Sequence, residues 1–181
     1  MPSNITIGYE GEYFVKDSNG TIIHQIPYDL PYDGGGRLVE VRSHWYPDPS
    51  DTLDSYKSQY DILKKQVKAK GLELVLMDGP YTWTTIPKGF KNPETAGLHV
   101  HFSRTDGKRW NIPDICDDLT KHFKVEIGSR ISQGDGFGSG GKFEHFRIKP
   151  HGWEYRLLPA TIDLKAVTKF IEQRLPVWEA L

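Results

Sequence analysis

The alternation of apolar and polar residues predicts two kinds of element along this chain. Period-two alternation and β-branched or aromatic runs indicate strands, whereas apolar residues every three or four positions indicate helices. The predicted strands are 6–15, 21–23, 37–42, 72–77, 98–103, 125–131, 143–148 and 153–158. The predicted helices are 48–70, 113–123 and 164–175. Without an internal repeat or a linker, we expect a single α+β domain spanning 1–181.

Local signals mark the turns, caps and loops between these elements. The residues Asp-Ser-Asn-Gly at 17–20 predict a tight turn that makes the first two strands a hairpin. Thr161 or Asp163 is expected to cap the last helix. The proline-punctuated segment 80–95 and the glycine-rich segment 134–141 are predicted to be loops, and the second is either a lid over a ligand or a plain turn.

Composition narrows the classes of protein that fit. A chain of 181 residues and 20.7 kDa with 37% hydrophobic residues can build one sizeable core. The net charge of −1 argues against a nucleic-acid partner held by phosphate neutralisation. The absence of a long apolar run and of a signal peptide predicts a cytoplasmic protein without a membrane partner. Cys116, the single cysteine, excludes an internal disulfide and is expected to be a buried apolar residue.

Two pairs of residues with metal-binding chemistry lie on predicted strands. Glu10 and Glu12 are separated by one residue, so both carboxylates leave the same face of their strand. Two like charges so placed need a cation, and oxygen ligands suit Mg²⁺ or Mn²⁺. His99 and His101 repeat this spacing with imidazoles, while Leu98, Val100 and Phe102 form the opposite, apolar face. Taken alone, either pair also fits an ordinary solvated strand.

A third pair, Glu154 and Arg156, combines a carboxylate with a guanidinium that can bind phosphate through two donors. Glu40 lies on another predicted strand between the first and second pairs. Each signal is weak by itself. Their order along the chain, with every pair on a predicted strand, indicates a nucleotide and metal site built across a sheet.

These residues resemble the signature strands of the carboxylate-amine ligase superfamily, which includes glutamine synthetase and glutamate-cysteine ligase. The sequence is similar in particular to the short amidoligases of bacteriophages. The matching segments are Tyr-Glu-Gly-Glu-Tyr-Phe at 9–14, Val-Glu-Val-Arg at 39–42, Ala-Gly-Leu-His-Val-His-Phe-Ser at 96–103, Phe-Arg-Ile-Lys at 146–149 and Trp-Glu-Tyr-Arg at 153–156.

The resemblance implies a fold and an activity. The fold would be a curved, mainly antiparallel sheet, a half-barrel like that of the glutamine synthetase catalytic domain, with helices on the convex face. The activity would be ATP-dependent ligation of a carboxylate to an amine, through an acyl phosphate and with two divalent ions, Mg²⁺ or Mn²⁺. Both substrates would be small molecules or peptides. A phage origin would place the protein in the host cytoplasm.

The resemblance also implies a role for each matching residue. Glu10 and Glu12 would each hold one of two metal ions. His99 would join one ion, and Glu40 would complete the set around the other. Glu154 would be a metal ligand beside the transferred phosphate.

The nucleotide would be bound by a second group of residues. His101 would contact its phosphates, and three cationic side chains would stabilise the phosphoryl charge: Arg130, Arg147 and Arg156. Glu154, Arg147 and Arg156 are therefore the expected catalytic residues. The base that deprotonates the amine stays open among His145, His151 and Asp135.

The chain is much shorter than glutamine synthetase, the larger protein that its motifs resemble. A partner subunit, such as a second copy of the chain, would then complete the site, or the site is open to a large substrate. One alternative function is an inactive nucleotide-binding or structural relative of the same fold. A cupin-type metal oxygenase is disfavoured, because 103–110 contains only Asp106 as a carboxylate ligand.

Overall fold

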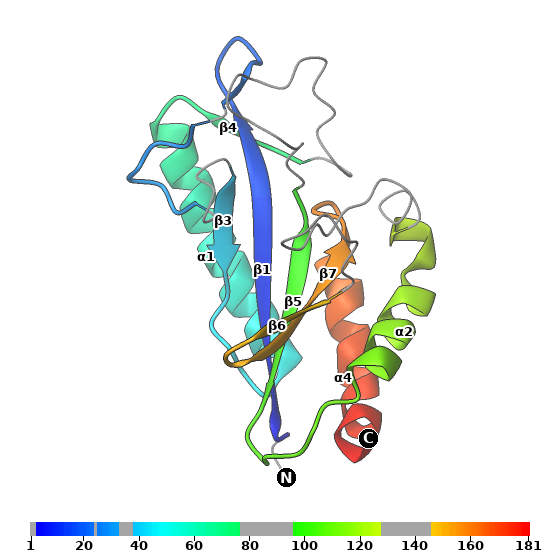
Figure 1. Ribbon diagram of the computed structural model, residues 1–181. Helices are drawn as coiled ribbons and strands as arrows, with labels where there is room; N and C mark the ends of the chain where they lie inside the picture. The colour runs from blue at the N-terminus through cyan, green and yellow to red at the C-terminus, as the bar shows by residue number, and fades with distance from the viewer. Residues whose placement is uncertain (1–2, 24, 33–37, 77–95, 128–145) are drawn as a thin grey trace.

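A computed structural model describes residues 3–23, 25–32, 38–76, 96–127 and 146–181 (Figure 1). The strands are β1 (Ile5–Lys16), β2 (Ile22–Ile23), β3 (Val39–Arg42), β4 (Glu73–Val75), β5 (Leu98–Arg104), β6 (Phe146–Lys149) and β7 (Gly152–Leu158). The helices are α1 (Pro49–Ala69), α2 (Ile112–His122) and α4 (Leu164–Ala180). Within these ranges the predicted order of strands and helices is confirmed with one exception, given below.

The seven strands form one sheet around the long strand β1. Strands β2, β1, β5, β7 and β6 follow one another across the sheet, and β3 and β4 also pair with β1. Every strand pair is antiparallel, which includes the predicted hairpin of β1 and β2. The predicted α+β class and antiparallel sheet are therefore confirmed. The expected half-barrel curvature is not found, because the sheet is neither closed nor strongly curled.

The two faces of the sheet have different neighbours. The helices lie behind the sheet in Figure 1 and cover what we call the apolar face. On β1, alternate residues such as Ile5, Ile7 and Tyr9 are buried on that face, as the period of two requires. Gly11 belongs to the same series, and a Cβ there would lie 2.0 Å from the Tyr56 hydroxyl of α1. The opposite face carries Glu10 and Glu12, and we call it the polar face.

The helix ends follow from local capping, with one correction. The Asp48 side chain accepts a hydrogen bond from the Ser50 backbone N–H at the start of α1, and Asp163 caps α4 through Lys165 in the same way. The predicted end of the last helix at 175 is wrong, because the buried Trp178 continues its apolar side to Ala180. No described helix is long and apolar enough to cross a membrane.

The predicted strand at 125–131 is also wrong where the structure describes it. Residues 124–127 are helical, and the Ile127 N–H donates to the Phe123 carbonyl at 2.9 Å. Phe123 and Ile127 are both buried whereas Val125 is 91% exposed, a spacing that suits a helix and not a strand. The loops predicted at 80–95 and 134–141, and the lid suggested for the second, lie outside the described residues.

Candidate functional site

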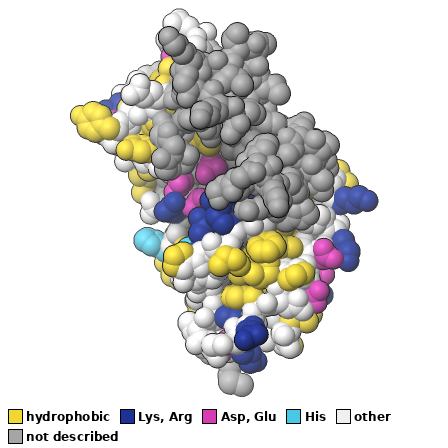
Figure 2. Space-filling view, viewed as in Figure 1, with side chains coloured by type: hydrophobic (Ala, Val, Ile, Leu, Met, Phe, Trp, Pro, Cys, Tyr) yellow, Lys and Arg dark blue, Asp and Glu magenta, His cyan; other side chains and the backbone are white. Residues whose placement is uncertain are grey.

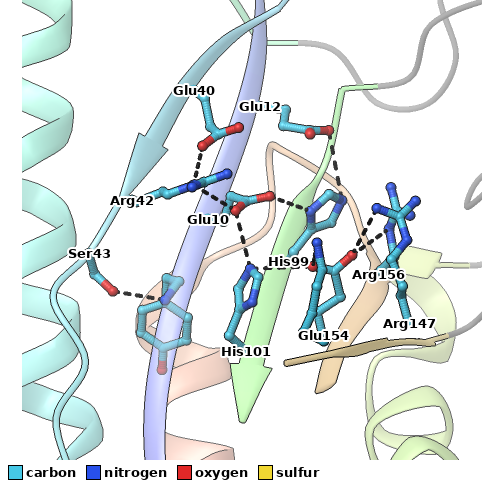
Figure 3. A network of polar contacts seen from close by, with 12 residues as sticks. Glu10, Glu12, Glu40, Arg42, Ser43, His99, His101, Arg147, Glu154 and Arg156 are labelled. Atoms are coloured by element: carbon cyan, nitrogen blue, oxygen red, sulfur yellow. Dashed lines mark hydrogen bonds and ion pairs between the residues drawn. The ribbon is translucent and has the colours of Figure 1, made fainter. Parts of the chain in front are cut away.

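The strand register brings the predicted site residues together on the polar face. Residues that are directly paired on neighbouring antiparallel strands point to the same side of a sheet. Glu10 on β1 lies between Arg42 of β3 and His99 of β5. The remaining pairs across this face are Glu12 with Glu40, His101 with Glu154, and Glu154 with Arg147. Residues from five strands therefore meet at one cluster (Figure 3).

Glu10 lies at the centre of this cluster and is buried. Its Oε1 is 3.1 Å from His99 Nδ1. Its Oε2 is 3.3 Å from His101 Nε2 and 2.9 Å from Arg42 Nε. Arg42 Nε also contacts Glu40, so one guanidinium bridges two carboxylates (Figure 3). Glu12 lies 3.8 Å from His99 Nε2 and completes the acidic side of the cluster.

The electrostatics favour an ionised Glu10 beside a neutral His99. Burial opposes the ionisation of Glu10, but its contacts with His101 and His99 outweigh burial and hold its pKa well below the ordinary range. Burial lowers the pKa of His99 to about 4, although the hydrogen bond with Glu10 opposes this change. A neutral His99 that donates from Nδ1 to Glu10 keeps the lone pair of Nε2 available, which is the form that binds metal ions.

Glu154 is the second buried carboxylate, with 1% of its side chain exposed. Lys149 Nζ lies 2.9 Å from its Oε2, and the guanidinium groups of Arg147 and Arg156 each lie 3.5 Å from its Oε1. Burial raises its pKa, but the histidines, Lys149 and Arg156 lower the pKa further, so the net shift is downward. Glu154 therefore brings a negative charge to a place where three cationic side chains converge.

Several buried polar atoms here have contacts without hydrogen-bond geometry. Among the described residues these include both ring nitrogens of His101, both carboxylate oxygens of Glu154, and the Nε and one terminal nitrogen of Arg156. Unsatisfied buried polar atoms are rare in native proteins and cost free energy. Their concentration at this cluster is typical of a site that can take up a polar or charged ligand.

Two groups of these residues could hold metal ions. The first group consists of the buried residues Glu10, His99 and Glu154. Each offers one possible ligand atom, and these three atoms lie within 4.8 Å of one another. In the second, Glu10, Glu12 and Glu40 meet the same criterion. All five predicted metal ligands fall into these groups. Glu10 belongs to both, whereas the resemblance implied that it holds one ion only.

A cavity of about 270 Å³ opens beside the first group. Arg42, Lys149 and the ring of Trp45 line it, together with His101 and His151. Trp45 can lie over β1 because residue 8 is glycine, where a Cβ would come within 2.6 Å of the indole. Figure 2 shows acidic side chains directly above Lys and Arg side chains in the middle of this face.

Three side chains at the site had no predicted role. Arg42 shares a strand face with Glu40, and Lys149 ends one of the matching segments, but neither position carried a distinct signal. From the sequence, Trp45 was expected only to pack against other side chains.

The predicted Arg130, and the base candidates His145 and Asp135, lie outside the described residues. His151 lines the cavity, and burial, with positive charge from His101 and Lys149, lowers its pKa.

Cys116 behaves as predicted. It is 4% exposed on α2, on the helix-covered side of the sheet. Burial raises the pKa of its thiol to about 12, so it stays protonated and unreactive at neutral pH.

Comparison with known proteins found no protein-family model and no curated protein sequence that matches this chain. The assignment of a function therefore depends on the motifs and on the geometry of the cluster.

Proposed function

We propose that this protein is an ATP-dependent carboxylate-amine ligase that forms an amide bond through an acyl phosphate. The observation that supports this proposal is the meeting of three separated sequence pairs in one buried cluster. Glu10 of the first pair, His99 of the second and Glu154 of the third lie within metal-binding distance of one another. The antiparallel sheet carries the three pairs on one face and the helices on the other, although it lacks the strong curvature of a half-barrel.

The donor set fits the divalent ions that such a ligase uses. The first group offers two carboxylates and an imidazole, and the second offers three carboxylates. These ligand types suit Mg²⁺ and Mn²⁺. When bound, two divalent ions would offset the negative charge of the nucleotide phosphates.

The basic side chains around Glu154 have the chemistry needed for phosphoryl transfer. Arg156 is largely buried, so its guanidinium is held in a fixed direction and its charge is weakly screened. Arg147 and Lys149 approach Glu154 from β6. We propose that these three cations bind the transferred phosphoryl group, and that His101 donates to a nucleotide phosphate.

The reaction would proceed in two steps. A substrate carboxylate attacks the γ-phosphorus of ATP, the bond to the bridging oxygen breaks, and ADP leaves. The amine then attacks the acyl carbon, the bond to the phosphate oxygen breaks, and inorganic phosphate leaves as the amide forms. A base takes the surplus proton of the amine. Of the three candidates for this base, His151 lies within the described residues, and it lines the cavity beside the cluster.

Metal-dependent nucleotide binding and turnover test this function. ATP is titrated calorimetrically into the purified protein with and without Mg²⁺ or Mn²⁺, and ADP release is then measured against a panel of carboxylates and amines, including peptides. We expect metal-dependent binding, and ADP release only when both substrate types are present. Binding without ADP release across the panel would favour the inactive relative. Gel filtration first establishes whether the protein is a homo-oligomer, and the titration is made on that form. Absence of metal-dependent binding of ATP to that form would overturn the proposal.

A further inference from the structure

Arg42 occupies a special place among the charged residues of the polar face. Its Nε lies 2.9 Å from Glu10 Oε2 and in direct contact with Glu40 Oε1. These two glutamates belong to the group Glu10, Glu12 and Glu40, whose oxygens lie within 4.8 Å of one another. Figure 3 shows the Arg42 side chain reaching into the space between them. The protein's own cation is therefore held by the carboxylates that could hold a metal ion.

A divalent ion and Arg42 cannot both use these oxygens. Mg²⁺ binds carboxylate oxygens at about 2.0–2.1 Å and Mn²⁺ takes the same ligands, so an ion between Glu10 and Glu40 would take the place of the guanidinium nitrogen. A divalent ion would also repel the positive charge of Arg42 at such short range. An ion bound to the two oxygens that Arg42 contacts, Glu10 Oε2 and Glu40 Oε1, therefore requires Arg42 to leave.

Arg42 has room to leave. Its side chain is 66% exposed, whereas Glu10 and Glu40 are 8% and 10% exposed. Arg42 also lines the cavity of about 270 Å³ beside Trp45 and Lys149. Rotation of its side chain toward solvent needs no movement of β3, because only the guanidinium and its stem have to turn.

The first group is arranged differently. Arg147, Lys149 and Arg156 pair with Glu154, and Arg42 contacts this group through Glu10 only. The side chain between Glu10 and Glu154 is the imidazole of His101, 3.3 Å from the first and 3.7 Å from the second. Among the described residues, none of these three bridges Glu154 to Glu10 or His99. The first group can therefore accept an ion without displacing an arginine from between its ligands.

We propose that Arg42 is an internal competitor of the divalent ion at Glu10, Glu12 and Glu40, and that this second group fills only when Arg42 turns away. This inference rests on the proposed function for the presence of two ions, and it adds an order to their binding. The group Glu10, His99 and Glu154 takes up the first ion, and the group blocked by Arg42 takes up the second at higher concentration.

Mn²⁺ binding to variants of Arg42 tests this proposal without any nucleotide. The EPR signal of free Mn²⁺ is followed during titration of the metal-stripped protein, which gives the number of bound ions and their affinities. Arg42→Gln, or Arg42→Met as a second variant, should tighten the weaker site by about tenfold or more, which corresponds to the loss of one favourable charged contact. Circular dichroism establishes that each variant is folded.

Two controls separate competition from a general effect of charge. In the Glu40→Gln background, Arg42→Gln should give no gain, since the second group has lost a ligand. Arg174→Gln removes an arginine that pairs with Asp118 away from the site, at 2.5 Å, and should leave both affinities unchanged. A gain of similar size in Arg174→Gln, or in the Glu40→Gln background, would overturn the proposal.

The proposal would also be overturned if the Arg42→Gln variant and the unmodified chain bound Mn²⁺ equally. This holds whether both bind two ions or neither binds any. The proposed function fails on a different readout. A gain in Mn²⁺ binding without ADP release on any substrate pair would leave the competition in place and count against the ligase.

Discussion

The two faces of the sheet differ in whether their buried polar groups have hydrogen-bond partners. On the apolar face, the buried tyrosine hydroxyls have neutral partners: Tyr9 with Thr168 at 3.0 Å, and Tyr155 with Thr120 at 2.8 Å. On the polar face, charged groups are buried and several of their atoms lack hydrogen-bond geometry. The first arrangement lowers the free energy of the fold, whereas the second raises it.

This difference supports the proposal that the polar face carries the function. Six of the seven buried side-chain atoms without a hydrogen-bond partner in the described part of the chain belong to His101, Glu154 and Arg156. The seventh is the indole nitrogen of Trp153. Burying such a cluster does not stabilise the fold by itself. A ligand that forms hydrogen bonds with these atoms would explain why they are buried. The comparison predicts that substitutions on the polar face change activity more than stability, and that the apolar face shows the reverse.

Loss of the Glu154 charge should have the largest effect on activity. Glu154→Gln keeps the size of the side chain but removes the proposed metal ligand beside three cations, so we expect ADP release to fall by about 10²- to 10³-fold or more. Steady-state assays at saturating ATP and Mg²⁺ measure this loss. Glu73→Gln is the matched control, because Glu73 pairs with Lys16 at the exposed edge of the sheet. Retained activity in Glu154→Gln would refute the metal assignment.

Truncation of Trp153 should have the largest effect on stability. Trp153 is fully buried on the apolar face, next to Glu154, and its ring stacks on Phe102 with centroids 4.5 Å apart. Trp153→Ala should lower the free energy of unfolding by about 3–5 kcal/mol. Urea unfolding measures this loss, with Ile148→Ala, at a side chain that is 63% exposed, as the control. A loss equal to that of the control would show that the apolar face is not the stabilising one.

Replacement of Arg156 by lysine should have an intermediate effect. The charge is kept, but a single ammonium cannot replace a planar set of donors that is able to bind two phosphate oxygens at once. We expect kcat to fall by about 10- to 100-fold, because one hydrogen bond to a charged group is worth about 1.5–3 kcal/mol. The stability should change little compared with Trp153→Ala. Unchanged turnover in Arg156→Lys would mean that Arg156 provides charge alone.

The pH dependence of stability should show the smallest effect. His99 has a pKa of about 4 in the folded protein because of burial, against about 6.5 in an unfolded chain. The unfolded chain therefore binds more protons between these values, and the free energy of unfolding falls as pH falls from about 6.5 toward about 4. Urea unfolding with EDTA at pH 7 and pH 5 measures the slope.

The same experiment on two variants assigns the slope. His99→Gln should flatten it, whereas His44→Gln, at an exposed histidine, should leave it unchanged. An unaltered slope in His99→Gln would contradict the neutral state of His99 in the folded protein.

The strands that carry the site could be predicted because their signals are local. The period of two along a strand is enough to place Glu10 with Glu12, and His99 with His101, on one face. The same reasoning failed at 125–127, where the buried Phe123 and Ile127 follow the helical spacing instead. The predicted end of the last helix at 175 was also wrong, since Pro176 lies inside α4 although proline usually ends a helix.

In the described part of the chain, the amino-acid sequence alone was sufficient for the order of elements outside 124–127, the α+β class and the residue pairs with metal-binding chemistry. These follow from periodicity, capping residues and side-chain type, which act over a few neighbouring positions. Three features of the site come from long-range contacts instead: Glu10 belongs to both metal-binding groups, Lys149 contacts Glu154, and Arg42 bridges Glu10 and Glu40. The register of five antiparallel strands sets these contacts, and register depends on pairing between segments far apart in the chain.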